Sequence, residues 1–159
     1  MQSAYLEVIA LVERLHRQFL EVVKLELDVN DAHDINNVQA MILYNIGDLE
    51  MTVGELTHRG CYLGSNVSYN VKKMLESGYI TQERSSHDRR SVRVRLSEKG
   101  LALHKKLTRM HEQHMSSLSQ GIVQGEDMLT TNRTLLRLDR FWKHTVDTGV
   151  RTAALSSAA

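Results

Sequence analysis

Residues 79–100 hold two strand-like segments separated by an arginine-rich polar turn, and this arrangement constrains the fold more than any other part of the chain. Polar and apolar residues alternate strictly from Val92 to Leu96, which is the period of a half-buried strand, and residues 79–84 supply a second strand. The sequence therefore predicts a β-hairpin. Its guanidinium groups suit bidentate contacts with phosphates or a DNA groove. The charged residues between positions 84 and 95 are Arg84, Asp88, Arg89, Arg90, Arg93 and Arg95.

The composition favours long helices around this hairpin. The 159 residues include no proline, 42% hydrophobic residues and 5% aromatic residues, so aliphatic side chains must fill most of the core of what we expect to be one domain, residues 1–159. No apolar stretch is long enough to cross a membrane, the first residues lack the pattern of a secretion signal, and the single cysteine suits a reducing compartment. We therefore expect a cytoplasmic protein that does not bind membranes.

The net charge of +1 conceals an uneven distribution. Residues 64–100 carry eight basic and four acidic side chains, whereas residues 1–63 carry four basic and ten acidic ones. Because salt screens charges beyond about 8 to 10 Å, the central segment can bind a polyanion although the whole chain is nearly neutral.

Helices are predicted where apolar residues recur every three or four positions. Asp34 or Asn36 can cap the second helix, and Thr52 with Glu55 forms a capping box at the start of the third. The first helix has apolar residues on more than one side, as expected of a helix shared with a partner subunit. The predicted helices span residues 3–28, 35–46, 52–59, 65–77, 97–120 and 128–148.

The third and fourth predicted helices are short, and glycines lie in the turn between them, which is the arrangement of a helix-turn-helix. The fourth helix is predicted to have an inward apolar face made by Val67, Val71, Met74 and Leu75. On its outward face, asparagine can pair with adenine, serine is a less selective partner, and lysine suits phosphate. A solvated helix face is the alternative, but the basic hairpin beside it favours DNA contact. The predicted DNA-contacting residues of this helix are Ser65, Asn66, Ser68, Tyr69, Asn70, Lys72 and Lys73.

The hairpin tip is predicted to contact the same DNA. We assign Arg90 to the groove, Arg89 to phosphate, and Asp88 to orienting the tip by hydrogen bonding. Arg93 and Arg95 lie on one strand face and reach either the DNA backbone or solvent.

These motifs together resemble the MarR family of bacterial transcriptional regulators. Asp88-x-Arg90 matches the family's wing tip, and Leu96-Ser-x-x-Gly100 matches its strand-to-helix junction. Val67-Ser68 and residues 75–80 match its recognition-helix and helix-end pattern. Residues 53–56 and 62–73 are similar to the LdtR-type members of alphaproteobacteria. Many relatives carry an arginine near position 69 or 70, which this chain lacks.

The resemblance implies a mainly helical (α+β) fold and a regulator of transcription. A winged helix-turn-helix lobe over residues 35–100 would carry a small antiparallel β-hairpin wing, framed by dimerisation helices in residues 1–30 and 101–150. It also implies a homodimer on a palindromic double-stranded DNA operator, with a small-molecule effector bound where the helical frame meets the lobe. By this analogy the effector-binding residues are His16, Phe19, Leu20, Met41, Tyr44 and Asn45.

Other readings of the chain remain open at this point. Cys61 lies between the two helices of the helix-turn-helix, so a thiol-responsive regulator is one alternative. His104, His111 and His114 fall near one stripe of the fifth helix, which would suit a metal-responsive regulator, although they do not form a zinc-protease motif and we assign no metal or cofactor. A non-specific nucleoid-type DNA-binding protein is another alternative. No catalytic signature predicts an enzyme.

Overall fold

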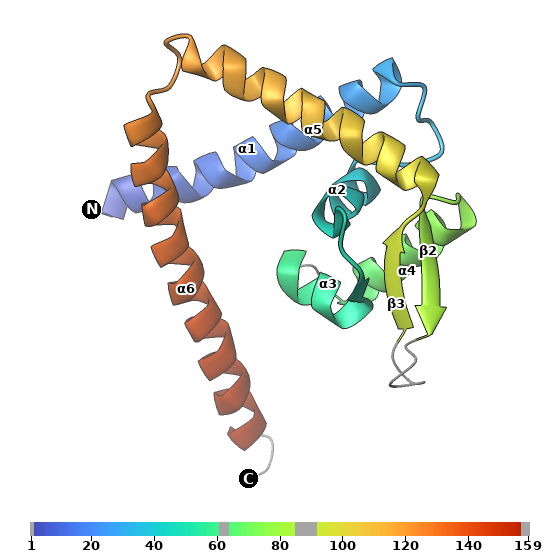
Figure 1. The fold of residues 1–159 in the computed structure, drawn as a ribbon. Coiled ribbons are helices and arrows are strands. Elements are labelled where there is room, and N and C mark those ends of the chain that lie inside the picture. Colours follow the sequence, from blue (N-terminus) through green and yellow to red (C-terminus); the bar gives the residue numbers. More distant parts are fainter. Residues whose placement is uncertain (1, 61–63, 85–91, 157–159) are drawn as a thin grey trace. The chain divides into compact units, whose positions relative to one another are not determined.

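The computed structural model describes residues 2–60, 64–84 and 92–156, and in these ranges it has six helices and a three-stranded antiparallel sheet (Figure 1). The chain divides into two compact units, residues 1–111 and residues 112–159. In chain order the elements are α1 (Gln2–Val29), α2 (Asn37–Ile46), β1 (Met51–Thr52), α3 (Val53–Gly60), α4 (Gly64–Glu76), β2 (Ile80–Arg84), β3 (Val92–Leu96), α5 (Glu98–Ser119) and α6 (Gly125–Ser156).

One apolar core holds the first unit together. α2 is its centre, because four of its residues are almost fully buried: Ala40, Ile42, Leu43 and Ile46. The last two turns of α1, the inner face of α4, the strands and the first half of α5 pack around α2 in the same cluster. Burial of this kind stabilises the fold by about 1.5 to 3 kcal/mol for each large aliphatic side chain.

Local capping sets the start of α2 and of α3. Asn36 caps α2, with its side chain accepting from Gln39 N at 2.8 Å and its own N–H donating to Gln39 Oε1 at 3.1 Å. The predicted capping box of α3 is confirmed, because Thr52 Oγ1 accepts from Glu55 N at 3.1 Å and Glu55 Oε2 accepts from Thr52 N at 2.6 Å. Gly47, with φ +57°, ends α2.

The sheet has one strand that the sequence did not predict. The hairpin strands pair as expected, with Gln82 opposite Val94, but β1 joins the other side of β3, where Met51 pairs with Val94 and Thr52 with Arg93. The strand order is therefore β1-β3-β2. A two-residue strand offers no alternation to detect, and Thr52 lies directly before α3.

The second unit consists of the end of α5 and the long helix α6. α6 begins three residues before its predicted start and continues to Ser156, well beyond the predicted end at residue 148. Its large apolar side chains are mostly exposed, among them Leu129, Leu136, Phe141 and Val146. In the part of the chain that the structure describes, no helix is both long and apolar enough to cross a membrane.

Candidate nucleic-acid interface

α4 has one buried face and one polar face. Val67, Val71 and Met74 are buried against the core as predicted. Asn66, Ser68, Lys72 and Lys73 are exposed, and Tyr69 exposes 62% of its surface. Of the predicted contact set, Ser65 lies in α4 but its side chain is outside the described part of the chain. The polar face therefore presents amide, hydroxyl, phenol and ammonium groups to the solvent.

Asn70 does not belong to this polar face, and its prediction as an outward-facing residue is wrong. It is only 9% exposed, and its Nδ2 donates to the carbonyl of Asn66 at 2.8 Å. The cause is helical spacing, since position 70 is three residues from Val67 and four from Met74 and so shares their side of the helix. A cavity of about 310 Å³ lies beside Asn70, between α4 and the start of α2.

The two lysines of α4 differ in their surroundings. Lys73 Nζ pairs with Glu76 Oε2 at 2.8 Å, and this hydrogen bond raises the pKa of Lys73 and lowers that of Glu76. DNA phosphate would have to compete with Glu76 for Lys73, so Lys72 is the better placed of the two for a phosphate contact.

At the wing, the arginines of β3 are engaged within the protein. Arg93 Nε lies 3.3 Å from Glu50 Oε1 and its Nη2 donates to the Glu50 carbonyl at 3.2 Å, while Arg95 Nη2 donates to Glu83 Oε1 at 2.7 Å. These contacts brace the base of the wing. Asp88, Arg89 and Arg90, the predicted tip residues, lie outside the described residues, as does Cys61.

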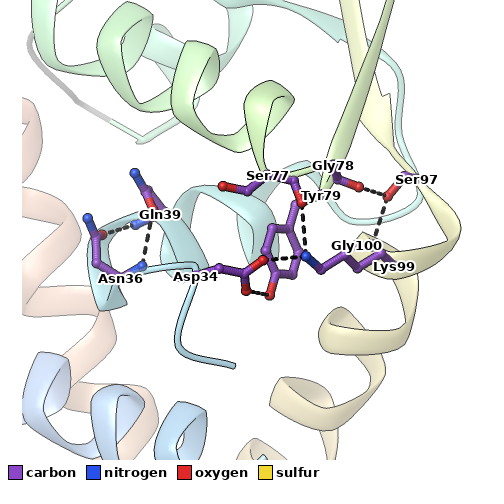
Figure 2. Close-up of polar contacts among 9 residues, drawn as sticks. All are labelled: Asp34, Asn36, Gln39, Ser77, Gly78, Tyr79, Ser97, Lys99 and Gly100. Atoms are coloured by element: carbon purple, nitrogen blue, oxygen red, sulfur yellow. Dashed lines mark hydrogen bonds and ion pairs between the residues drawn. The ribbon is translucent and has the colours of Figure 1, made fainter. Parts of the chain in front are cut away.

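Beyond the C-terminal end of α4, a junction of polar contacts ties this helix to two other segments (Figure 2). Tyr79 Oη donates to Asp34 Oδ1 at 2.6 Å, and Lys99 Nζ donates to Asp34 Oδ2 and, at 2.9 Å, to the Ser77 carbonyl. Lys99 Nζ also lies 4.1 Å from the centroid of the Tyr79 ring. The hydrogen bonds from Lys99 and Tyr79 lower the pKa of Asp34, and burial together with the bond to Asp34 raises the pKa of Tyr79. From the sequence, Asp34 was expected only as a possible cap of the second helix, and none of these contacts was predicted.

Ser97 and Gly100 complete the junction at the start of α5. Ser97 Oγ donates to the Gly78 carbonyl at 2.6 Å and accepts from Gly100 N at 3.1 Å, while Ser97 N donates to the Tyr79 carbonyl at 3.0 Å. A Cβ at position 100 would lie 2.1 Å from that same carbonyl oxygen. Only glycine fits there, which explains the Leu-Ser-x-x-Gly pattern at residues 96–100 in steric terms.

Some of the residues predicted to bind an effector gather where α1, α2 and α5 meet. Tyr44 lies between two histidines of α5, with ring centroids 5.2 Å from His104 and 4.7 Å from His111, and Phe19 lies 5.6 Å from His111. Met41 is partly buried against the core beside them, whereas His16 is exposed. Leu20 is half-buried and its carbonyl accepts from Asn37 Nδ2 at 3.0 Å; Asn45 is also half-buried. The effector role of these six residues stays a prediction.

The three histidines of the predicted stripe on α5 lie in different environments. His104 and His111 pack on Tyr44, whereas His114 is exposed. Among the described residues, no group of three or more histidine, cysteine or acidic side chains could hold a metal ion. A separate cavity of about 490 Å³ lies beside the Asp34 junction and is lined in part by Asp31, His33, Leu103 and Lys106.

The chain is similar to known proteins in both sequence and fold. A family model described as a winged helix DNA-binding domain matches residues 35–100. The exopolysaccharide II synthesis transcriptional activator ExpG of Rhizobium meliloti is 38% identical over 146 residues, which cover 92% of this chain and 75% of that protein.

Solved structures confirm the predicted winged helix-turn-helix fold. FabT of Streptococcus pneumoniae, crystallised in complex with DNA, superposes with a TM-score of 0.72 at 21% identity, covering 87% of this chain and 97% of FabT. The reduced form of MarR from E. coli gives a TM-score of 0.63 at 16% identity, covering 81% and 93% of the two chains.

Proposed function

Because this chain belongs to the MarR family of winged-helix transcriptional regulators, and is a DNA-binding regulator rather than an enzyme, we propose that it recognises a palindromic operator as a homodimer. In this proposal α4 enters the major groove, and the wing formed by β2 and β3 contacts the flanking backbone and groove. Small-molecule binding in the helical frame adjusts the spacing of the two lobes, and with it the affinity for the operator.

The polar face of α4 is the observation that carries the proposal. Asn66, Ser68 and Tyr69 provide an amide, a hydroxyl and an exposed phenol within one helical turn, and Lys72 follows on the same helix for phosphate. Ser65 and the tip residues Asp88, Arg89 and Arg90 extend the set. Asn70 is not among the proposed base-reading residues, because its amide is buried and bonded within the helix.

Exposed apolar side chains support the homodimer. α1 carries Leu6, Leu11 and Leu15 exposed on its first half, which a monomer would leave in water, and α6 carries the set described above. We propose that residues 1–30 and 101–150 form the dimer interface, consistent with the two-fold symmetry of a palindromic site. The double variant Leu11→Lys/Leu15→Lys should shift the protein from dimer to monomer in sedimentation equilibrium, and an unchanged mass would refute this interface.

The effector site is proposed around Phe19, Met41 and Tyr44, with His16, Leu20 and Asn45 at its border. The support is that the aromatic rings of Phe19 and Tyr44 meet two histidines of α5, so a planar ligand could stack there and bond to imidazole. A site touching α1, α2 and α5 at once would let a ligand alter how the lobe is held by the helical frame.

The targets and the subtype are proposed from relatedness. The motifs at residues 53–56 and 62–73 support an LdtR-type regulator, and the relative named for activating exopolysaccharide synthesis supports genes of the cell surface as targets. We propose that the protein acts in the cytoplasm, where its DNA is found.

Selection of bound fragments from genomic DNA, followed by sequencing, tests the core of the proposal. The recovered sites should share an inverted repeat, and fluorescence polarisation should show at least about a thousandfold preference for the best site over a scrambled duplex at physiological salt. Arg90→Ala should weaken binding to the best site by about 1 to 3 kcal/mol, as should Tyr69→Ala. Asp48→Ala, at an exposed position just after α2, serves as the control.

Two results would contradict the proposal. Equal affinity for the selected and scrambled duplexes across several salt concentrations would favour a non-specific nucleoid-type protein. Unchanged affinity of Tyr69→Ala, Asn66→Ala and Ser68→Ala would remove α4 from the interface.

A further inference from the structure

The junction beyond α4 joins three segments that are far apart in the sequence. Asp34 lies in the connector between α1 and α2, Tyr79 lies 45 residues later, directly before β2, and Lys99 lies 65 residues after Asp34 in the first turn of α5 (Figure 2). Each of the three contacts both of the others. The junction therefore closes a triangle around the end of α4.

The junction also contacts the three backbone carbonyls that directly follow α4. Lys99 Nζ binds the Ser77 carbonyl at 2.9 Å, and Ser97 binds the Gly78 carbonyl with its hydroxyl and the Tyr79 carbonyl with its N–H. The last carbonyls of α4 already accept from the backbone, Lys73 from Ser77 N and Met74 from Tyr79 N, both at 2.9 Å, so the contacts of Lys99 and Ser97 hold the turn that follows the helix. Residues 97–99 therefore hold the turn that continues directly from the end of α4.

Ion-pair energy alone does not account for this arrangement. The side chains of Asp34 and Lys99 are 52% and 46% exposed, and pairs in such surroundings add little to stability. Tyr79, by contrast, is 3% exposed, so its hydroxyl provides a fixed point against which Asp34 is held. The arrangement is better suited to fixing the direction of α4 than to stabilising the fold.

We propose that Asp34 and Lys99 are positioning residues for DNA recognition: with Tyr79 they fix the C-terminal end of α4 against the α1–α2 connector and the first turn of α5, and so set how α4 meets the operator. The inference rests on the proposed role of α4 in the major groove. Neither residue touches DNA in it.

A small tilt of α4 about its C-terminal end would displace the residues near its N-terminal end by a larger distance. The proposed base-reading residues lie about ten positions before Ser77, which is about 15 Å along a helix. A tilt of about 5° at the anchored end would move them by about 1.3 Å. Since hydrogen bonds to bases need donor–acceptor distances of about 2.7 to 3.2 Å, a displacement of that size is enough to break them.

For Asp34, an electrostatic role and a positioning role predict opposite changes in DNA affinity, so one variant distinguishes them. Removing the Asp34 carboxylate makes the protein more positive, so simple electrostatics predicts tighter DNA binding for Asp34→Asn. The positioning role predicts weaker binding for Asp34→Asn and for Lys99→Met alike. Asp34→Asn also keeps an oxygen that can accept from Tyr79, which limits damage to the fold.

The experiment measures polarisation of the full-length protein with two labelled duplexes, the best site selected from genomic DNA and its scrambled counterpart. We expect Asp34→Asn and Lys99→Met each to lower affinity for the selected duplex about five- to tenfold and affinity for the scrambled duplex less than about twofold. The double variant should lose no more than the worse single variant, because both remove the same contact. Lys99→Arg, which can restore the bond to Asp34, should recover most of the affinity.

Controls separate positioning from folding and from the proposed function. A partly unfolded variant contains less active protein, so its apparent affinity falls equally for both duplexes. Thermal melts detect such unfolding directly. Asp48→Asn, which removes an exposed carboxylate just after α2, matches the charge change of Asp34→Asn and should weaken neither affinity. Tighter binding of Asp34→Asn, or equal losses on both duplexes, would overturn the inference. If Tyr69→Ala also has no effect on the selected duplex, the proposed role of α4 itself has failed.

Discussion

Gly100→Ala tests whether the start of α5 is closed to any side chain. Gly100 lies in the first turn of α5, against the carbonyl of Tyr79, which already accepts a hydrogen bond from Ser97 N at 3.0 Å. A Cβ at this position would lie 2.1 Å from the carbonyl oxygen and 3.2 Å from Leu96 Cβ. Because an ordinary carbon–oxygen contact is about 3.3 Å, the two backbones must separate by about 1.2 Å.

The cost follows from three effects. Forced separation of a packed site costs about 1 to 3 kcal/mol, and weakening the bond from Ser97 to Tyr79 costs about 1 kcal/mol more. Alanine returns at most about 1 kcal/mol through its greater helix propensity. The net loss is about 2 kcal/mol, which for a chain of 159 residues corresponds to a fall in Tm of about 4 to 8 °C.

Melts followed by circular dichroism at one fixed protein concentration measure this shift, since oligomerisation makes Tm depend on concentration. Gly54→Ala is the matched control: Gly54 also lies in the first turn of a helix, α3, but its Cβ would meet only Thr52 Oγ1 at an ordinary 3.8 Å. We expect that control to melt at or slightly above the wild-type temperature. Equal Tm values for Gly100→Ala and Gly54→Ala would refute the steric argument.

Three further predictions concern capping and titration. Thr52→Ala removes the cap of α3 and should lower Tm by about 2 to 4 °C in the same assay; no shift would mean that water replaces the cap without loss. In the folded state the pKa of Asp34 lies below its ordinary value of 3.8, so the ionised carboxylate stabilises the protein above pH 3.8, and this contribution is lost as the pH falls through the lower folded pKa. Asp34→Asn should therefore lose less free energy of unfolding on acidification than the wild type does. Identical acid-unfolding curves would contradict the shift. The raised pKa of Tyr79 keeps its phenol neutral in the folded protein, so the stabilisation from this group is present below pH 10 and is lost as the pH rises above 10. In an alkaline absorbance titration, the phenolate signal that wild type shows and Tyr79→Phe lacks should appear only as the protein unfolds. Appearance of that signal near pH 10 in the folded protein would contradict the raised pKa.

Local patterns predicted most of the elements and their ends. The alternation at residues 92–96 and the capping box at Thr52 and Glu55 are short-range signals, and both are confirmed. At the start of α2 the sequence left Asp34 and Asn36 as alternatives, and Asn36 is the cap. α6 was predicted to begin too late because Gly125 was read as loop, although acidic residues in its first turn favour a helix start.

What the sequence could not predict depends on contacts between distant segments. The Asp34, Tyr79 and Lys99 junction joins residues 20 to 65 positions apart, which leaves no periodic signal, and Asp34 in isolation was read as a helix cap. The misplacement of Asn70 has a different cause. Its polarity suggests solvent, but its spacing from Val67 and Met74 determines its side, so helical periodicity predicts the burial of this residue better than residue type does.

The short strand β1 has a consequence for the entropy of DNA binding. Thr52 pairs with Arg93 of the wing and at the same time caps α3, so one residue joins the base of the wing to the first helix of the helix-turn-helix. The base of the wing is therefore ordered when the protein folds, not when it meets its operator. A lobe assembled in this way loses little conformational freedom on binding, and more of its contact energy remains to distinguish one sequence from another.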